Sequence, residues 1–259
     1  MSVAQGTGTY PAYIGNGRLL STADGGTALS TTRAFIAIPA GINSVILTPR
    51  NFATAVVAQV ALNPFISVIK TNDAMGTAPV DYSENAQDGA AGTLVTLSSL
   101  PTLANGGALY VGAEALFGGL MATVVAANSG GGTMAVTYWD GDSWANITPT
   151  DGTANMANTG LITWTVPTDW TPVPLVTALN RIWAGLGTPK YWVRIATSAA
   201  YDASVTLSSL YAYNQYADAL PELASGQVFQ TAINRAQNGG CIQALTDAGT
   251  ANLIVNGYR

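Results

Sequence analysis

Short runs of alternating apolar and polar residues follow one another from residue 33 onward. In the run FISVIKT, residues 65–71, an extended backbone places Phe65, Ser67 and Ile69 on one side and Ile66, Val68 and Lys70 on the other. A period of two residues is the signature of a β-strand within a sheet. The sequence therefore predicts a strand at this position.

Similar runs recur along the chain and are rich in Thr, Val, Ile and aromatic residues. Asn-Gly, Asp-Gly and Gly-Gly steps separate them, as is typical of strands joined by tight turns. The predicted strands cover residues 33–40, 43–49, 53–62, 65–71, 93–100, 108–114, 120–128, 133–139, 143–147, 161–166, 191–197 and 204–213. No 12-residue stretch before residue 216 shows a convincing helical period of 3.6 residues. The pattern predicts an all-β protein, an antiparallel β-sandwich or jelly roll.

The two ends of the chain differ from this pattern. Residues 1–32 are small and polar, and we expect an extended N-terminal arm that is ordered only when it lies against another surface. Residues 33–215 are predicted to form the β-sandwich domain. Residues 216–259 are predicted to be a C-terminal extension, with one short helix around 222–236 and a final strand at 252–258. The hexapeptide VTLSSL occurs at 95–100 and again at 205–210, which suggests two topologically similar strands.

Charged residues make up only 9% of the 259-residue chain, against about 25% in a typical globular protein. A surface this poor in charge is easiest to explain if much of it is buried against copies of the same chain or against other partners. The net charge is −5 and the nine basic residues are scattered. Nucleic acids and anionic membranes require basic patches, so neither is an expected partner. A membrane-spanning helix is also not expected, because no run of about 18 apolar residues exists.

The chain contains no histidine and one cysteine, Cys241. Catalytic triads that use histidine, zinc sites with histidine ligands and thiolate metal sites are therefore excluded. Cys241 cannot form an internal disulfide and is expected to be a buried apolar residue. Nothing pairs the three glutamates as a glycosidase would require. We expect a non-enzymatic protein without a cofactor.

Because no secretory signal is recognisable at the N-terminus, we also expect synthesis in a cytoplasm.

Residues 138–148, YWDGDSWANIT, place two tryptophans around Asp-Gly-Asp. If Gly141 and Asp142 are the central turn residues, Trp139 lies opposite Trp144 and their rings pack across a hairpin. If the turn is centred on Asp140 and Gly141 instead, the tryptophans fall out of register. In both cases a hairpin with an aromatic brace is the simplest interpretation.

Two binding alternatives remain for this region. Exposed tryptophan rings with polar neighbours could stack on a carbohydrate, and the candidates are Trp139, Trp144 and Trp170. Trp164 and Trp192 lie within strand patterns, so these two are expected in the core.

The second alternative is a calcium site. Its candidate ligands are Asp140, Asp142 and Asp151. The Asp-Gly-Asp spacing matches part of an oxygen-ligand loop, but the distal acid of an EF-hand is missing. Nearby, Asp169 is expected to make or cap a turn, and Arg194 is expected either to pair with an acid on a neighbouring strand or to face solvent.

Residues 81–195 carry a resemblance to a known group of proteins. Along them lie the aromatic hairpin YWDGDSW, a DGT turn, the segment GLITWTVPTDW and the strand YWVRI, in this order. This order resembles a β-sandwich module of tailed-bacteriophage virion proteins, which include decoration proteins and tail or fibre components. The resemblance covers about 115 of the 259 residues.

The resemblance implies a structural role within a virion, with the aromatic motif building the sandwich. We expect a capsid decoration or cement protein that stabilises neighbouring capsid subunits through β surfaces and extended arms. Its partners would be the major capsid protein and copies of itself, as a homo-oligomer such as a trimer. The alternative is a tail or tail-fibre component that binds host-surface carbohydrate through exposed tryptophans.

Overall fold

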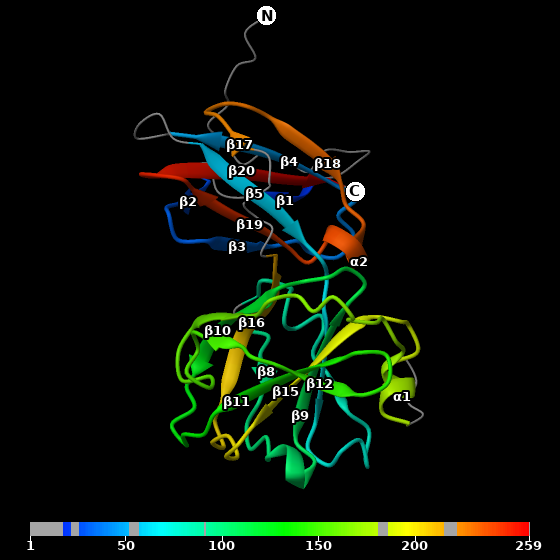
Figure 1. Ribbon diagram of the computed structural model, residues 1–259. Helices are drawn as coiled ribbons and strands as arrows, with labels where there is room; N and C mark the ends of the chain where they lie inside the picture. Colours follow the sequence, from blue (N-terminus) through cyan, green and yellow to red (C-terminus); the bar gives the residue numbers. More distant parts are fainter. Residues whose placement is uncertain are drawn as a thin grey trace, which may run out of the picture. The chain divides into compact units, whose positions relative to one another are not determined.

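The computed structural model describes residues 18–21, 26–51, 57–90, 92–180, 186–214 and 222–258, of which 18–21 are described by their backbone alone. The protein is nearly all β, with several antiparallel sheets, as the sequence predicts (Figure 1). The chain divides into two compact units. Unit 1 comprises residues 1–62, 216–234 and 242–259, and unit 2 comprises residues 63–215 and 235–241.

Unit 1 is built from two sheets. The first has the order β1-β20-β4-β18, with β2 also paired to β20, and the second has the order β17-β5-β19-β3. Their bounds are β1 Arg18–Ser21, β2 Thr27–Leu29, β3 Ala34–Ala37, β4 Ser44–Arg50, β5 Ala58–Asn63, β17 Glu222–Leu223, β18 Phe229–Ala232, β19 Cys241–Thr246 and β20 Ala251–Tyr258. Asn63 and Cys241, at the ends of β5 and β19, are assigned to unit 2.

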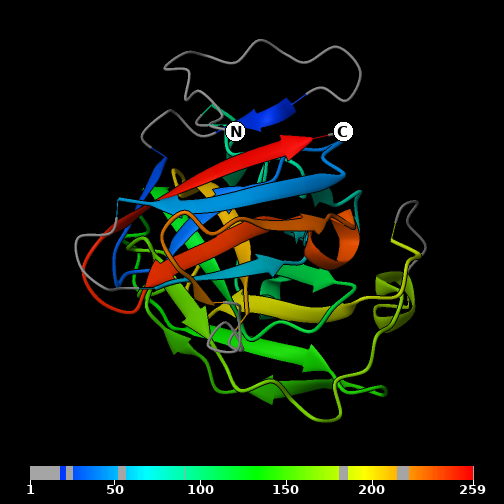
Figure 2. The ribbon, with the colours of Figure 1, turned by 90° about the horizontal axis from the view of Figure 1, so that it is seen from above.

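Alternation along β4 and β20 explains why these strands lie at the centre of their sheet. Every second residue of each is buried, including Val45 and Leu47 of β4 and Leu253 and Val255 of β20. Side chains of the second sheet, such as Ile242, complete the same apolar core. Figure 2 shows β4 and β20 side by side, with β18 on the other side of β4.

This arrangement differs from the predicted division at residues 33–215 and 216–259. The C-terminal segment is no separate extension, because β20 pairs with β4 from Asn252↔Arg50 to Tyr258↔Ser44. The final strand predicted at 252–258 is confirmed as β20, and the strand predicted at 43–49 is confirmed as β4.

The helix predicted around 222–236 is wrong. The segment forms β17 and β18, and only α2, Arg235–Asn238, is helical. Gly226 has a φ of +75°, which interrupts any helix there. Phe229–Ala232 pairs instead with β4.

Of the predicted N-terminal arm, residues 1–17 and 22–25 lie outside the described residues. The described parts do not form a free arm, because β1 and β2 pair with β20 within unit 1.

Unit 2 also contains two sheets. A five-stranded sheet has the order β13-β14-β10-β16-β8, and a six-stranded sheet has the order β12-β11-β15-β9-β6-β7. Their bounds are β6 Ser67–Thr71, β7 Val80–Asp81, β8 Val95–Thr96, β9 Ala108–Ala113, β10 Gly119–Ala126, β11 Met134–Trp139, β12 Trp144–Ile147, β13 Thr150–Asp151, β14 Gly160–Thr163, β15 Tyr191–Thr197 and β16 Thr206–Tyr213. Two short helices, η1 Leu103–Asn105 and α1 Leu175–Ala178, lie in the connections.

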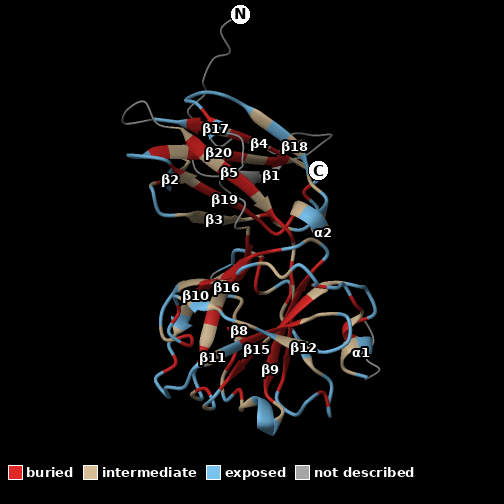
Figure 3. Ribbon diagram, in the orientation of Figure 1, coloured by how far each residue is buried: buried red, intermediate tan, exposed pale blue. Residues whose placement is uncertain are grey.

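The six-stranded sheet is covered on one face and partly covered on the other. One face contributes residues such as Val111 and Val193 to a core shared with Leu120 and Leu207 of the five-stranded sheet. The other face packs against the segment around α1 (buried positions are red in Figure 3). The sandwich architecture of unit 2 follows from these two sheets.

The repeated hexapeptide has a structural counterpart. Val95 and Thr96 of β8 pair with Leu207 and Thr206 of β16, so the two copies of VTLSSL run antiparallel beside each other. Among the described residues, no helix is long and apolar enough to cross a membrane.

Candidate functional site

The YWDGDSW segment forms the predicted hairpin between β11 and β12. Its register is Trp139↔Trp144 and Val136↔Ile147, as expected for a turn centred on Gly141 and Asp142. The Asp140 carboxylate accepts the backbone N–H groups of Asp142 (2.9 Å) and Ser143 (2.7 Å). These bonds lower the pKa of Asp140, and Gly141 adopts a φ of +112°. Local chemistry therefore fixes the turn.

The two tryptophans face each other on one side of the hairpin. Their ring centroids lie 5.7 Å apart at an interplanar angle of 72°, an edge-to-face contact. The Trp144 ring also contacts Tyr110 of β9, at 5.5 Å between centroids. Both tryptophans are partly exposed. The pair therefore braces the hairpin and still presents ring surface to solvent.

A polar row crosses the sheet beside these rings. Asn146, Thr137, Arg194 and Tyr110 are successive cross-strand partners on β12, β11, β15 and β9. Cross-strand partners share a face, and residues two apart on a strand share it too. The tryptophans are therefore on the same face as the row. We call Thr137, Trp139, Trp144, Asn146 and Arg194 together the Arg194 face.

Arg194 is the central group of this face. Its Nε donates to Thr137 Oγ1 (3.1 Å), and its Cζ lies 5.0 Å from the centroid of the Trp144 ring. The Tyr110 hydroxyl also acts on the charge of Arg194 and opposes the lowering of its pKa. These contacts hold the guanidinium in place without neutralising its charge.

The electrostatic surroundings of Arg194 contain no compensating acid within the described part of the chain. Burial lowers the pKa of Arg194, and the group that opposes this shift is Tyr110. Lys190 differs, because Glu114 and Asp81 act against the lowering of its pKa by burial. The ion pair between Arg235 and Glu84 (2.6 Å) lies elsewhere in unit 2. Neither predicted environment for Arg194, an acid partner or simple solvent exposure, describes the half-buried group in this face.

Trp170 was a predicted carbohydrate-stacking residue, and the structure contradicts this role. Its side chain is only 6% exposed and packs against Phe117 and Tyr191. Its Nε1 donates to the backbone oxygen of Trp192 (3.2 Å). Trp164 and Trp192 are buried, as predicted, and Trp183 lies outside the described residues.

The three aspartates predicted as calcium ligands are not brought together. Asp140 and Asp142 lie in the hairpin, whereas Asp151 belongs to β13 of the other sheet. The Asp151 carboxylate accepts the N–H groups of Thr153 (2.8 Å) and Asn155 (2.7 Å). Across the described residues, no three His, Cys, Asp or Glu side chains are placed to hold a metal ion.

The remaining acids near the motif also make local contacts. Asp169 accepts a hydrogen bond from the Tyr138 hydroxyl (2.8 Å), which raises the pKa of Tyr138. Between β6 and β8, Asp81 accepts a hydrogen bond from Ser83, Asp88 accepts one from Thr93, and Glu84 pairs with Arg235. These carboxylates therefore stabilise turns and loops through local hydrogen bonds and one ion pair.

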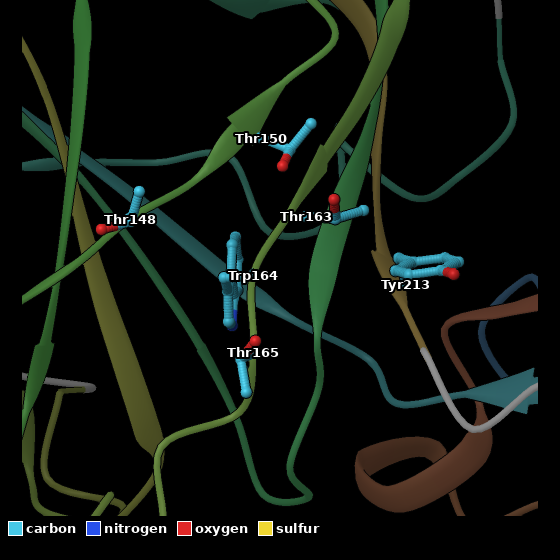
Figure 4. A pocket seen from close by; sticks show the side chains of 6 residues that line it. All are labelled: Thr148, Thr150, Thr163, Trp164, Thr165 and Tyr213. Atoms are coloured by element: carbon cyan, nitrogen blue, oxygen red, sulfur yellow. The ribbon is translucent and has the colours of Figure 1, made fainter.

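A shallow pocket of about 310 Å³ opens on the five-stranded side of unit 2 (Figure 4). It is lined by Thr148, Thr150, Thr163, Trp164, Thr165 and Tyr213. Thr150 and Thr163 are cross-strand partners on β13 and β14. Sequence reasoning missed this pocket, because threonines spread over two strand patterns give no recognisable motif.

Searches of protein-family models and of curated proteins find no match to this chain. The functional inference therefore rests on the residues of the chain and their geometry.

Proposed function

We propose that the chain is a non-enzymatic structural protein of a tailed-bacteriophage particle, acting as a capsid decoration or cement protein. It would bind the major capsid protein and copies of itself and stabilise neighbouring subunits through its β surfaces. The observation that carries this proposal is that aromatic and acidic residues of the motif make contacts that hold the fold of unit 2 together. Asp140 holds the turn, Asp169 holds Tyr138, and Trp170 fills the core.

The charge content of the chain supports the same role. Only 9% of the residues are charged, so the surface of the chain carries few charged side chains. Such a surface gives isolated copies of the protein little electrostatic repulsion from one another. It is well suited to close contact with a neighbouring subunit. Exposed apolar side chains such as Val125 and Val228, each 60% exposed, are consistent with contact surfaces.

The copy number of the chain in purified virions tests the proposal. Heads and tails would be separated, and the chain would be quantified against the major capsid protein by mass spectrometry. Hundreds of copies that travel with heads are expected for a cement protein. A few to a few tens of copies with tails would instead identify a tail component, and absence from both fractions would reject a virion role.

A further inference from the structure

We propose that the Arg194 face binds an acidic saccharide, with the sugar carboxylate on the Arg194 guanidinium and the sugar ring against Trp144 and Trp139. The exposed amide of Asn146 would bond to sugar hydroxyls at the rim. This inference goes beyond a structural role in a particle and does not depend on it.

The charge of Arg194 points to an anionic ligand. The guanidinium is half-buried, and its described contacts are the Thr137 hydroxyl and the Trp144 ring, with Tyr110 as its cross-strand neighbour. A cation taken partly out of water is poorly compensated by neutral groups alone. A planar guanidinium forms two parallel bonds with a carboxylate, and such charge-assisted bonds are the strong ones. A ligand carboxylate would supply the missing negative charge.

The tryptophans point to a ring-shaped, hydroxylated ligand instead of a simple anion. The planes of the Trp139 and Trp144 rings meet edge to face at 72°, so the two rings form an aromatic corner. Aromatic rings with polar groups alongside are suited to ligands that have both apolar and hydroxylated sides. Thr137 and Asn146 are the polar groups on this face, and Asn146 is exposed. An aromatic corner, an amide and a cation together fit a sugar acid.

The threonine-lined pocket is a second possible saccharide site, and it differs in charge. None of its six lining residues carries a charge. A ligand selected by that pocket should show no preference for a carboxylate. The two sites can therefore be distinguished by a pair of probes that differ only in charge.

The test uses methyl β-D-glucuronide and methyl β-D-glucoside, which differ only in having a carboxylate or a hydroxymethyl group at C6. Each is titrated at millimolar concentrations into the full chain, while the indole N–H signals are followed by two-dimensional NMR. W139F and W144F identify the two signals. We expect both signals to shift with the glucuronide, and its affinity to exceed that of the glucoside at least about 10-fold, as a charge-assisted pair supplies.

Three variants and one control variant localise the effect. Arg194→Met should weaken glucuronide binding at least about 10-fold and leave the chemical shifts of the other core tryptophans in place. Arg194→Lys keeps the charge but loses the planar pair of donors, so it should also weaken binding. Arg50→Met is the matched control, because Arg50 is exposed at the end of β4, and it should leave binding unchanged. Asn146→Ala, at an exposed position, should weaken both sugars by about 5-fold without affecting the fold.

Several results would overturn the proposal. Equal affinity for the two glycosides, full binding by Arg194→Met, or no shift of either indole signal with the glucuronide would each do so. If inorganic phosphate at matched ionic strength displaced the glucuronide equally well, the face would be a simple anion site and the saccharide assignment would fail. If Arg194→Met fails to fold, the glycoside comparison, Arg194→Lys and Asn146→Ala still decide.

Discussion

Single side chains in this protein are fixed mainly by burial and by short-range hydrogen bonds. Cys241 is fully buried; its Sγ lies 3.5 Å from the Asn63 amide nitrogen, and burial raises the pKa of the thiol to about 12. The sequence predicted a buried, inert cysteine, and the structure confirms the burial. The sequence could not predict Asn63 as a partner, because 178 residues separate the two.

Cys241 makes stability depend on pH in the alkaline range. Its folded pKa, about 12, lies above the ordinary value of 9.0. A raised folded pKa means that the protonated thiol stabilises the fold fully below about pH 9, and that this contribution is lost as the pH rises toward 12. We expect the midpoint of urea unfolding to fall over this range more steeply for the wild type than for Cys241→Ala. Equal slopes would contradict the shift.

Gly112 is required by its close approach to an indole ring. A Cβ at this position would overlap the side chain of Trp192 on the neighbouring strand β15. We expect Gly112→Ala to lower the free energy of unfolding by about 1–3 kcal/mol, as overpacking of a core does. Gly187→Ala is the matched control, since a Cβ there meets nothing within 4 Å. Chemical denaturation of both variants measures the difference, and equal stability would refute the packing argument.

At the scale of elements, hairpins could be predicted and strand order could not. The hairpin of β11 and β12 follows from turn chemistry within seven residues, and the sequence offers two registers, of which the structure has the one with Trp139 opposite Trp144. The position of Arg194 beside Trp144 depends on β15 pairing with β11, across 57 residues at the Thr137 contact. The tryptophan pair of the Arg194 face was therefore among the predictions from the sequence. The position of Arg194 beside this pair was not. Short strands such as β17 and β18 were not predicted, because their extended structure depends on pairing with the distant strands β5 and β4.

The β11–β12 turn should depend on one of its two aspartates. Asp140 accepts two backbone N–H groups, whereas no such bonds are found for Asp142 among the described residues. We expect Asp140→Ala to lower the melting temperature and Asp142→Ala to leave it nearly unchanged. Because the pKa of Asp140 is lowered, its stabilising effect is present above the ordinary carboxyl pKa and is lost as the pH falls through the folded value. The difference between the variants should therefore vanish in acid. Equal melting temperatures at neutral pH would contradict the role of Asp140.

For the whole molecule, the decisive feature is that unit 1 is assembled from both ends of the chain. β4 obtains its central neighbour, β20, from the last residues, and unit 2 is formed almost entirely by the intervening segment. The sequence suggested one sandwich with extensions, because hydrophobic alternation identifies strands but not their partners. The all-β class could be predicted from the sequence. The division into two units could not, because it depends on long-range strand pairing.

Removal of residues 242–259 tests this division. The truncation deletes β20 and nearly all of β19, so unit 1 should lose its fold. Unit 2 retains all its residues, and all six tryptophans lie between residues 139 and 192. We expect the tryptophan fluorescence maximum to stay close to that of the full chain, while far-ultraviolet circular dichroism shows loss of strand signal. A fluorescence spectrum typical of exposed tryptophan would show that unit 2 cannot fold without unit 1.

The pairing of residue 50 with residue 252 also sets the order of events during synthesis. When β4 leaves the ribosome, its apolar face has no partner, and it stays without β20 until residues 251–258 have been synthesised. The strands of unit 2 emerge consecutively in the meantime and can fold first. A chain that ends prematurely would therefore carry an unfinished sheet with exposed Val45 and Leu47, the kind of surface that chaperones and proteases recognise. The sheet around β4 can therefore form only after residues 251–258 have been synthesised, long after β4 itself.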